Sequence, residues 1–211
     1  MTNLRRLNYH KIYLFDSINQ TNPLKEFLYF LKFNHVSPID FSYSSQADTL
    51  HPNLSVTENF SLDAIPKSLI RDNENNLLTF LSEIENPYLK DLILLIGDLK
   101  QKVHHLNNEQ IKIASLTKAI LSPSAYILLD SPDKSLSTDV LGLLKDCLCY
   151  ENQKNNRSIL LNSHRQILWP DIITNIVTKN EQHQFIVTKN PLLKIVDSSK
   201  NNRFSLKKVA S

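Results

Sequence analysis

Apolar residues along the chain follow two alternating patterns. Short runs rich in branched and aromatic residues, such as AYILLD at 125–130, are typical of strands covered on both faces. Longer stretches with apolar residues three or four positions apart, such as NNEQIKIASLTKAILS at 107–122, are typical of helices. The two patterns predict strands at 11–15, 37–45, 125–130 and 157–163, helices at 22–33, 107–122 and 138–150, a turn into a helix at 51–60, a mostly helical stretch at 64–100, and a hairpin at 175–188 around Asn180-Glu181. The alternation predicts an α/β fold with a mainly parallel sheet, interrupted by a helical segment at about 55–115.

Composition narrows the class of protein. A chain of 211 residues with 41% hydrophobic content is most simply one globular domain. Its net charge of +3 is too small to indicate nucleic-acid binding by itself. No apolar run approaches the roughly 18 residues of a membrane span, and the start, MTNLRRLNYHK, lacks the apolar core of a signal peptide. We therefore expect a cytosolic chain, or one held at a membrane through a partner.

Candidate metal ligands are few. Cys147 and Cys149 lie too close along the chain for an ordinary disulfide, and no second Cys or His pair stands at zinc-ligand spacing. We expect buried thiols, a loop at His104-His105, and no metal site. The chain has only two glycines but 22 asparagines, so we expect asparagine to serve turns that glycine usually serves.

Four segments, in order, carry a resemblance to a known family. They are SYSSQADTLHPNLSVTENFSL (42–62), LNNEQIKI (106–113), AYILLDSPDKSLS (125–137) and ILLNSHRQI (159–167). They resemble the Q-loop, the signature loop, the Walker B strand with its D-loop, and the H-loop of the nucleotide-binding subunit of ABC transporters. Leu106 stands 24 residues before Asp130 and His164 stands 34 after it, which is similar to the family spacing.

The resemblance runs from about 11 to 190 and implies a P-loop NTPase-like fold. It implies one domain over 1–211, with the helical subdomain at about 55–115. Only 24 residues separate Asn22 from Gln46, fewer than in the family. We therefore expect the family's antiparallel β-layer, including the aromatic residue that stacks on adenine, to be reduced.

The segment of this chain that corresponds to the family's phosphate-binding loop lacks the residues that the loop needs. A P-loop needs glycines that let N–H groups approach phosphates, a lysine, and a hydroxyl for magnesium. After the strand KIYLF this chain has DSINQTNPL, residues 16–24. Asp16, Asn19 and Thr21 take the glycine positions, Asn22 the lysine position and Pro23 the hydroxyl position. Each lost hydrogen bond to a charged group forfeits about 1.5–3 kcal/mol of binding free energy. Micromolar binding of a nucleotide corresponds to about 8 kcal/mol, so several such losses would remove most of that affinity.

The other nucleotide-contacting positions are altered too. The signature serine and glycines correspond to Asn107, Asn108 and Glu109. Ser131 stands where the family has the carboxylate after Walker B, and Ser137 stands at the D-loop aspartate. We therefore expect no ATP or magnesium cofactor and no competent ATP hydrolysis.

Three positions keep the family's residue type: Gln46, Asp130 and His164. Asp130 has an alternative role in bracing the end of the sheet, and His164 has one as a buried, hydrogen-bonded histidine. In the family the glutamine links the nucleotide site to the helical segment that touches the membrane partner, a link that could persist without ATP.

The resemblance implies an ABC-transporter ATPase-like subunit, and the losses favour a pseudo-ATPase with a structural or regulatory role. Its partners would be a membrane permease and an intact ABC ATPase subunit or a second copy, on the cytoplasmic side of a membrane. The helical segment at about 55–115 would face the permease.

Three alternatives stay open. In a divergent active ATPase, Lys11 or Lys25 would replace the missing lysine, although neither has the spacing. A soluble ABC-type protein acting on nucleic acid or translation has support only from the basic tail: Lys200, Arg203, Lys207 and Lys208. An unrelated α/β scaffold is the third.

Overall fold

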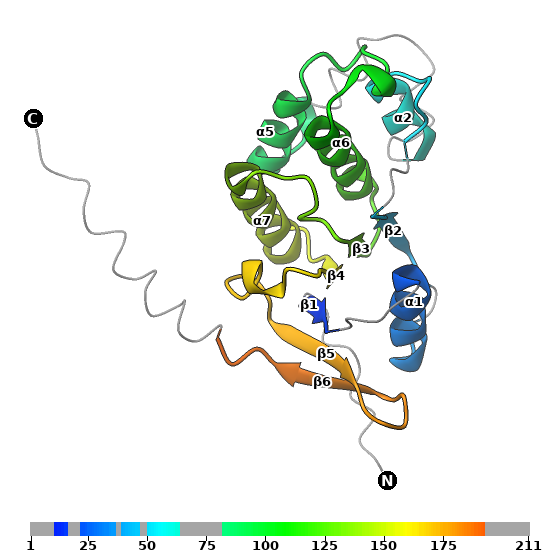
Figure 1. The fold of residues 1–211 in the computed structure, drawn as a ribbon, viewed down its shortest axis with the longest axis vertical. Helices are drawn as coiled ribbons and strands as arrows, with labels where there is room; N and C mark the ends of the chain where they lie inside the picture. Colours follow the sequence, from blue (N-terminus) through cyan, green and yellow to red (C-terminus); the bar gives the residue numbers. More distant parts are fainter. Residues whose placement is uncertain (1–10, 17–21, 37–38, 47–49, 64–81, 193–211) are drawn as a thin grey trace, which may run out of the picture.

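The computed structural model describes residues 11–16, 22–36, 39–46, 50–63 and 82–192. Its centre is one six-stranded sheet in the order β2-β3-β4-β1-β5-β6 (Figure 1). The strands are β1 Ile12–Phe15, β2 Phe41–Ser44, β3 Tyr126–Asp130, β4 Ser158–Asn162, β5 Asn175–Lys179 and β6 Phe185–Lys189. The first five run parallel, and β6 pairs antiparallel with β5. This confirms the predicted mainly parallel sheet and the predicted hairpin.

The central strands form because their sequences suit burial on both faces. Every residue of β1, β3 and β4 is buried, as expected for parallel strands covered by helices. In register, Leu128 of β3 lies opposite Leu160 of β4, and Asp130 lies opposite Asn162. The register therefore places polar side chains together where the apolar runs end.

Helices cover both faces of the sheet (Figure 1). The α-helices of the described residues are α1 Pro23–Phe33, α2 Val56–Asp63, α5 Pro87–Ile96, α6 Asn108–Leu121 and α7 Thr138–Gln153, of which α2 packs against α6. On one face, Phe27 and Phe30 of α1 pack edge-to-face on Phe15 of β1. On the other, the residues of β1 that alternate with these, Ile12 and Leu14, join a core with α5, α6 and α7. This alternation is the strand period of two acting on a two-sided core.

The predicted helical stretch at 64–100 is confirmed only in part. α5 ends at Ile96 and is followed by Gly97, whose φ of 87° is a backbone conformation that suits glycine. Most of the stretch before α5, residues 64–81, lies outside the described residues. In the described part of the chain, no helix is both long and apolar enough to span a membrane.

Two smaller expectations had mixed outcomes. Cys147 is a buried free thiol, as predicted, and burial raises its pKa, whereas Cys149 is only partly buried. Asparagine was expected at left-handed turn positions. Among the described non-glycine residues with positive φ, Asn156 is the one asparagine, and the others are His35, Ser131, Ser135 and His183.

Candidate functional site

The candidate site lies at the edge of the sheet where the parallel strands end, which is the usual ligand edge of such sheets. Asp130, the last residue of β3, is 6% exposed. Its carboxylate accepts hydrogen bonds from the Gln46 backbone N–H (3.3 Å), the Asn162 side-chain amide (2.9 Å) and the Ser131 hydroxyl (3.2 Å). The structure thus brings Gln46, Asp130 and Ser131 together, and Asp130 links the segment after β2 to the end of β4.

Ser131 occupies a constrained position beside this carboxylate. It is buried, has a φ of 49°, and donates its backbone N–H to the Asn162 carbonyl at 2.7 Å. A non-glycine residue in this conformation is uncommon, and the surrounding contacts must hold it. Its hydroxyl donates a hydrogen bond to Asp130. Serine also has no carboxylate, so this position cannot bind or activate a water molecule as a carboxylate would.

A buried lysine reaches the same edge from α6. Lys112 is 4% exposed, and its ammonium donates to the backbone carbonyls of Ser45 (3.3 Å) and Asp130 (3.5 Å). It therefore ties the segment after β2 to the end of β3. Within the described ranges, no three His, Cys, Asp or Glu side chains are grouped to bind a metal ion.

A second cluster joins the loops that follow β3 and β4. Asp133 is buried, and its carboxylate accepts from the Ser163 hydroxyl (2.6 Å) and the Arg165 guanidinium (2.8 Å). Arg165 also donates to the Asp133 backbone carbonyl. Sequence reasoning missed this cluster. Its only signal was charge of opposite sign in the two loops, DSPDKS and NSHRQ.

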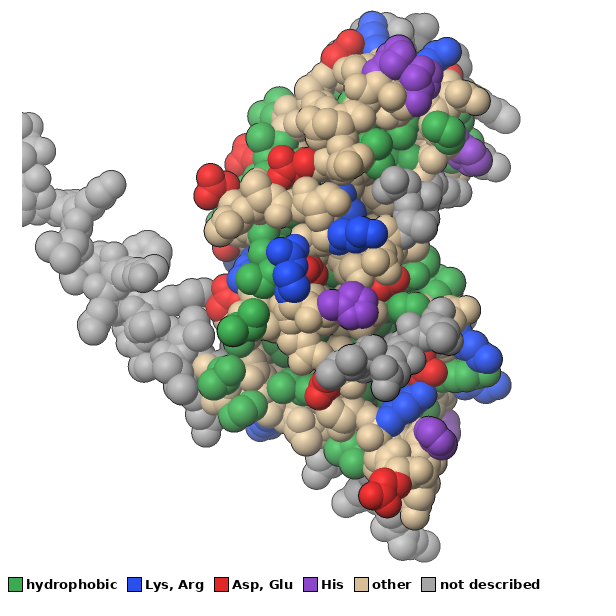
Figure 2. Space-filling model, in the orientation of Figure 1, with side chains coloured by type: hydrophobic (Ala, Val, Ile, Leu, Met, Phe, Trp, Pro, Cys, Tyr) green, Lys and Arg blue, Asp and Glu red, His purple; other side chains and the backbone are tan. Residues whose placement is uncertain are grey.

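His164 lies next to this cluster and is exposed. The alternative that made it a buried structural histidine is therefore wrong. Lys134 and Arg165 are also exposed in these two loops. Figure 2 shows lysine, arginine and histidine side chains gathered across the middle of one face of the molecule. The exposed part of the two loops thus carries basic groups, whereas the carboxylates of Asp130 and Asp133 are buried beneath.

The start of α1 is the position at which the resemblance predicts a phosphate-binding loop. Asn22 is its N-cap, and the Asn22 side chain accepts the Lys25 backbone N–H at 3.0 Å. Pro23 is the first helical residue and has no N–H to donate. Asp16, at the end of β1, accepts a bond from the Gln166 side chain at 2.9 Å. Asn19 and Thr21 lie outside the described residues.

Side chains at the start of α6 cap the backbone N–H groups of that helix. Asn107 and Gln110 form a reciprocal capping box, with bonds of 2.9 and 3.0 Å. Glu109 accepts the backbone N–H of Ser137, at the start of α7, at 2.7 Å, and this bond lowers the pKa of Glu109. Asn108 is the exposed first residue of the helix. The contacts of Asn107 and Glu109 thus run within α6 and to α7, not to Asp130.

Comparison with known proteins identifies the fold. No protein-family model and no curated protein matches the sequence, but solved structures match it over most of its length. The ATP-binding subunit of an ABC transporter superposes with a TM-score of 0.65 at 13% identity, covering 93% of this chain and 85% of that one. An inward-facing protein described as a metal-chelate-type ABC transporter gives a TM-score of 0.61 at 18% identity, over 87% and 75%.

A third match is a dimeric ATP-binding cassette in a post-hydrolysis state with ADP and Pi, with a TM-score of 0.59 at 16% identity, covering 87% of this chain and 88% of that one. At such identities the likeness establishes the fold alone. With the sheet order and the helices on both faces, it shows that this chain has the ABC ATPase-like, P-loop NTPase fold.

Proposed function

We propose that this protein is an ABC ATPase-like subunit that does not hydrolyse ATP and serves a structural or regulatory role in a membrane transport complex. The observation that carries the proposal is the start of α1. A phosphate bound there would need free backbone N–H groups. Pro23 supplies none, and the Asn22 side chain already occupies the N–H of Lys25.

The start of α6 supports the same proposal. In the resemblance, this is where a partner subunit's nucleotide would be met. Here the Asn107 side chain occupies the N–H of Gln110, and Glu109 adds a carboxylate. A negative charge at this position opposes a phosphate, and displacing the caps would cost about 1 kcal/mol for each.

The bonds between neighbouring loops add a third line of support. In an ATPase, nucleotide and magnesium contact these loops. Here Asp133 and Arg165 hold the two loops together with protein atoms alone, and Lys112 does the same between β2 and β3. These contacts within the chain fix the loops relative to one another, which suits a structural role.

Nucleotide binding tests the catalytic half of the proposal. Isothermal titration of the purified full chain with Mg-ATP should give a Kd weaker than about 1 mM, or less than about 4 kcal/mol of binding energy. An intact cassette subunit, measured in the same buffer, provides the positive control. A magnesium-dependent Kd in the micromolar range would refute the proposal and favour the divergent active ATPase.

Partner capture tests the transport half. The tagged chain, purified from gently solubilised membranes, should bring down a polytopic permease, with or without an intact ABC ATPase subunit. Leu94 on α5 is 74% exposed, in the segment expected to face the permease. Leu94→Glu should reduce recovery, whereas Ile186→Glu, at an exposed position on β6, should not.

The translation alternative shares this fold, so only binding experiments separate the two. An archaeal ribosome recycling factor matches with a TM-score of 0.57 at 14% identity, covering 85% of this chain and 34% of that one. Recovery of RNA or ribosomes without a permease, lost steeply as salt rises, would favour this alternative over the transport role.

A further inference from the structure

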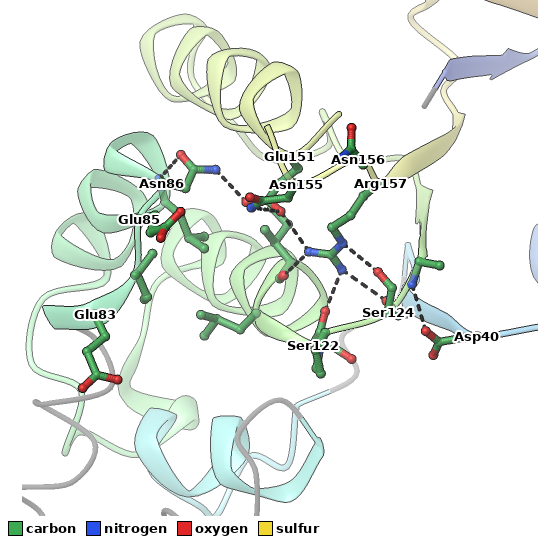
Figure 3. A pocket seen from close by; sticks show the side chains of 16 residues that line it. Asp40, Glu83, Glu85, Asn86, Ser122, Ser124, Glu151, Asn155, Asn156 and Arg157 are labelled. Atoms are coloured by element: carbon green, nitrogen blue, oxygen red, sulfur yellow. Dashed lines mark hydrogen bonds and ion pairs between the residues drawn. The ribbon is translucent and has the colours of Figure 1, made fainter. Parts of the chain in front are cut away.

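A pocket of about 640 Å³ opens at the sheet edge opposite the candidate site (Figure 3). Its lining includes residues directly before three parallel strands: Asp40 before β2, Ala125 before β3 and Arg157 before β4. The end of α6 and the segment leading into α5 complete the wall. Its volume is in the range of ligand pockets, and it contains none of the residues that the resemblance assigns to nucleotide.

The polar floor of the pocket is already satisfied. The Arg157 guanidinium donates to the carbonyls of Ile120 (2.6 Å), Ser122 (2.6 Å) and Ser124 (2.7 Å) and to the Glu151 carboxylate (3.1 Å). Glu151 also accepts bonds from the Asn86 and Asn155 side chains. An occupant therefore has little to gain from the floor, and recognition must come from the walls and rim.

The walls and rim combine apolar surface with negative charge. Ile84, Leu89 and Pro123 contribute apolar lining, whereas Glu83 and Glu85 are exposed carboxylates at the rim (Figure 3). Counting the whole lining, four carboxylates (Asp40, Glu83, Glu85, Glu151) face one guanidinium, Arg157. A segment that is both basic and partly apolar fits this combination.

We propose that this pocket is a docking site for the chain's own C-terminal segment, residues 193–211. That segment carries five cations, Lys194, Lys200, Arg203, Lys207 and Lys208, against one carboxylate, Asp197. It also carries apolar residues among the cations, including Phe204 and Leu206. Its charge and composition thus complement the rim and walls, and the inference does not depend on the proposed transport function.

The chain leaves the sheet on the side where the pocket lies. Lys189, the last residue of β6, pairs with Asn175, the first residue of β5. Asn190 is fixed there by side-chain bonds to the carbonyls of Pro170 and Ile173, both 2.9 Å. β1 to β5 run parallel, so the start of β5 lies at the same edge of the sheet as the residues that precede β3 and β4. The end of β6, which pairs with the start of β5, therefore lies at the edge where the pocket opens.

The distance across the sheet is within reach. From β6 to β3 the path crosses four strand spacings, or roughly 19 Å at about 4.8 Å each. Residues 193–211 number 19 (211 − 193 + 1), and such a chain spans up to roughly 63 Å when extended. The segment can therefore reach the pocket and still place several residues in it.

Limited proteolysis of the full chain tests the proposal. Trypsin cleaves after Lys200, Arg203 and Lys207, and intact-mass spectrometry gives the cleavage rate. A docked segment is protected, so Glu83→Gln/Glu85→Gln should be cleaved about threefold to tenfold faster than the wild type, from the loss of exposed ion pairs. Salt at about 0.5 M should bring the wild type close to the variant rate.

A matched control removes two exposed carboxylates elsewhere, in Asp146→Asn/Glu181→Gln, and should keep the wild-type rate. The fluorescence of the buried Trp169 verifies that each variant is folded. Equal cleavage rates in all three proteins would overturn the proposal. Protection that rises with protein concentration would also overturn it, because the occupant would then be the segment of a second copy.

Discussion

Substitution of Arg157 is expected to cause a large loss in the free energy of unfolding. It is 8% exposed, and its five hydrogen bonds hold the end of α6 and the Glu151 carboxylate, with acceptors Ile120, Ser122 and Ser124. Arg157→Met leaves the buried carboxylate without its counter-charge and the helix-end carbonyls without donors. Breaking a buried ion pair in this way costs about 3–5 kcal/mol, out of a total stability of about 5–15 kcal/mol.

The comparison with lysine separates charge from geometry. Arg157→Lys keeps the positive charge but has three donors on one nitrogen, so it cannot match a planar fork aimed at several carbonyls. We expect it to lose two or three of these bonds but to keep the counter-charge of Glu151, so it should cost less than the loss of about 3–5 kcal/mol expected for Arg157→Met. The double variant Arg157→Met/Glu151→Gln should lose less free energy of unfolding than the two single variants lose together, because no unpaired charge remains in it.

Urea unfolding followed by Trp169 fluorescence measures these costs. Trp169 is the only tryptophan and is fully buried, so its emission reports the core. With a slope of about 2 kcal/mol per molar urea, Arg157→Met should lower the midpoint by about 1.5–2.5 M. Lys154→Met, at an exposed cation close by, should change it little. A free energy of unfolding for Arg157→Met within 1 kcal/mol of the control would refute the reasoning.

Three further predictions concern the candidate site. Asp133→Asn should lower the midpoint by about 0.5–1 M, since it removes the buried charge that pairs with the exposed Arg165; an unchanged midpoint would show that the two loops do not depend on this contact. Glu109→Gln should lower the free energy of unfolding by under about 1 kcal/mol at pH 7, because the bond to Ser137 is solvent-exposed. The pKa of Glu109 is lowered in the folded protein, so this stabilisation is present above pH 4.5 and is lost as the pH falls below it. A difference between variant and wild type that persists at pH 2 would contradict the assignment. Burial, and to a smaller extent the charge of Asp130, raises the pKa of Tyr43 to about 12. The stability that the neutral Tyr43 contributes should be complete below pH 10 and lost as the pH rises towards 12. In an absorbance titration, Tyr43→Phe should lack one late step.

The sheet was predictable because its signal is local. AYILLD and RSILLN are apolar over their whole length, and buried parallel strands have that pattern. α1 was predictable for the same reason, since Pro23 marks its start and aromatic residues recur at helical spacing. Four family-like segments in the right order then indicated the fold that the structural matches show.

The contacts within the site were not predictable, because they join residues far apart in sequence. Asp133 and Arg165 are 32 residues apart, and no local pattern pairs them. Lys112 would be placed on the solvent side of α6 by its charge, yet it is buried because two backbone carbonyls receive its ammonium. His164 was assigned a buried alternative, but its loop leaves the sheet edge and exposes it.

The reciprocal capping box at the start of α6 has an evolutionary consequence. Each of its two bonds depends on the other residue, so a single replacement of Asn107 by a smaller side chain removes stability before a second change can compensate. Changes that open this helix start to a phosphate would therefore pass through less stable intermediates, and Pro23 sets a separate barrier at α1. Stepwise selection for folding alone therefore tends to preserve the capping box.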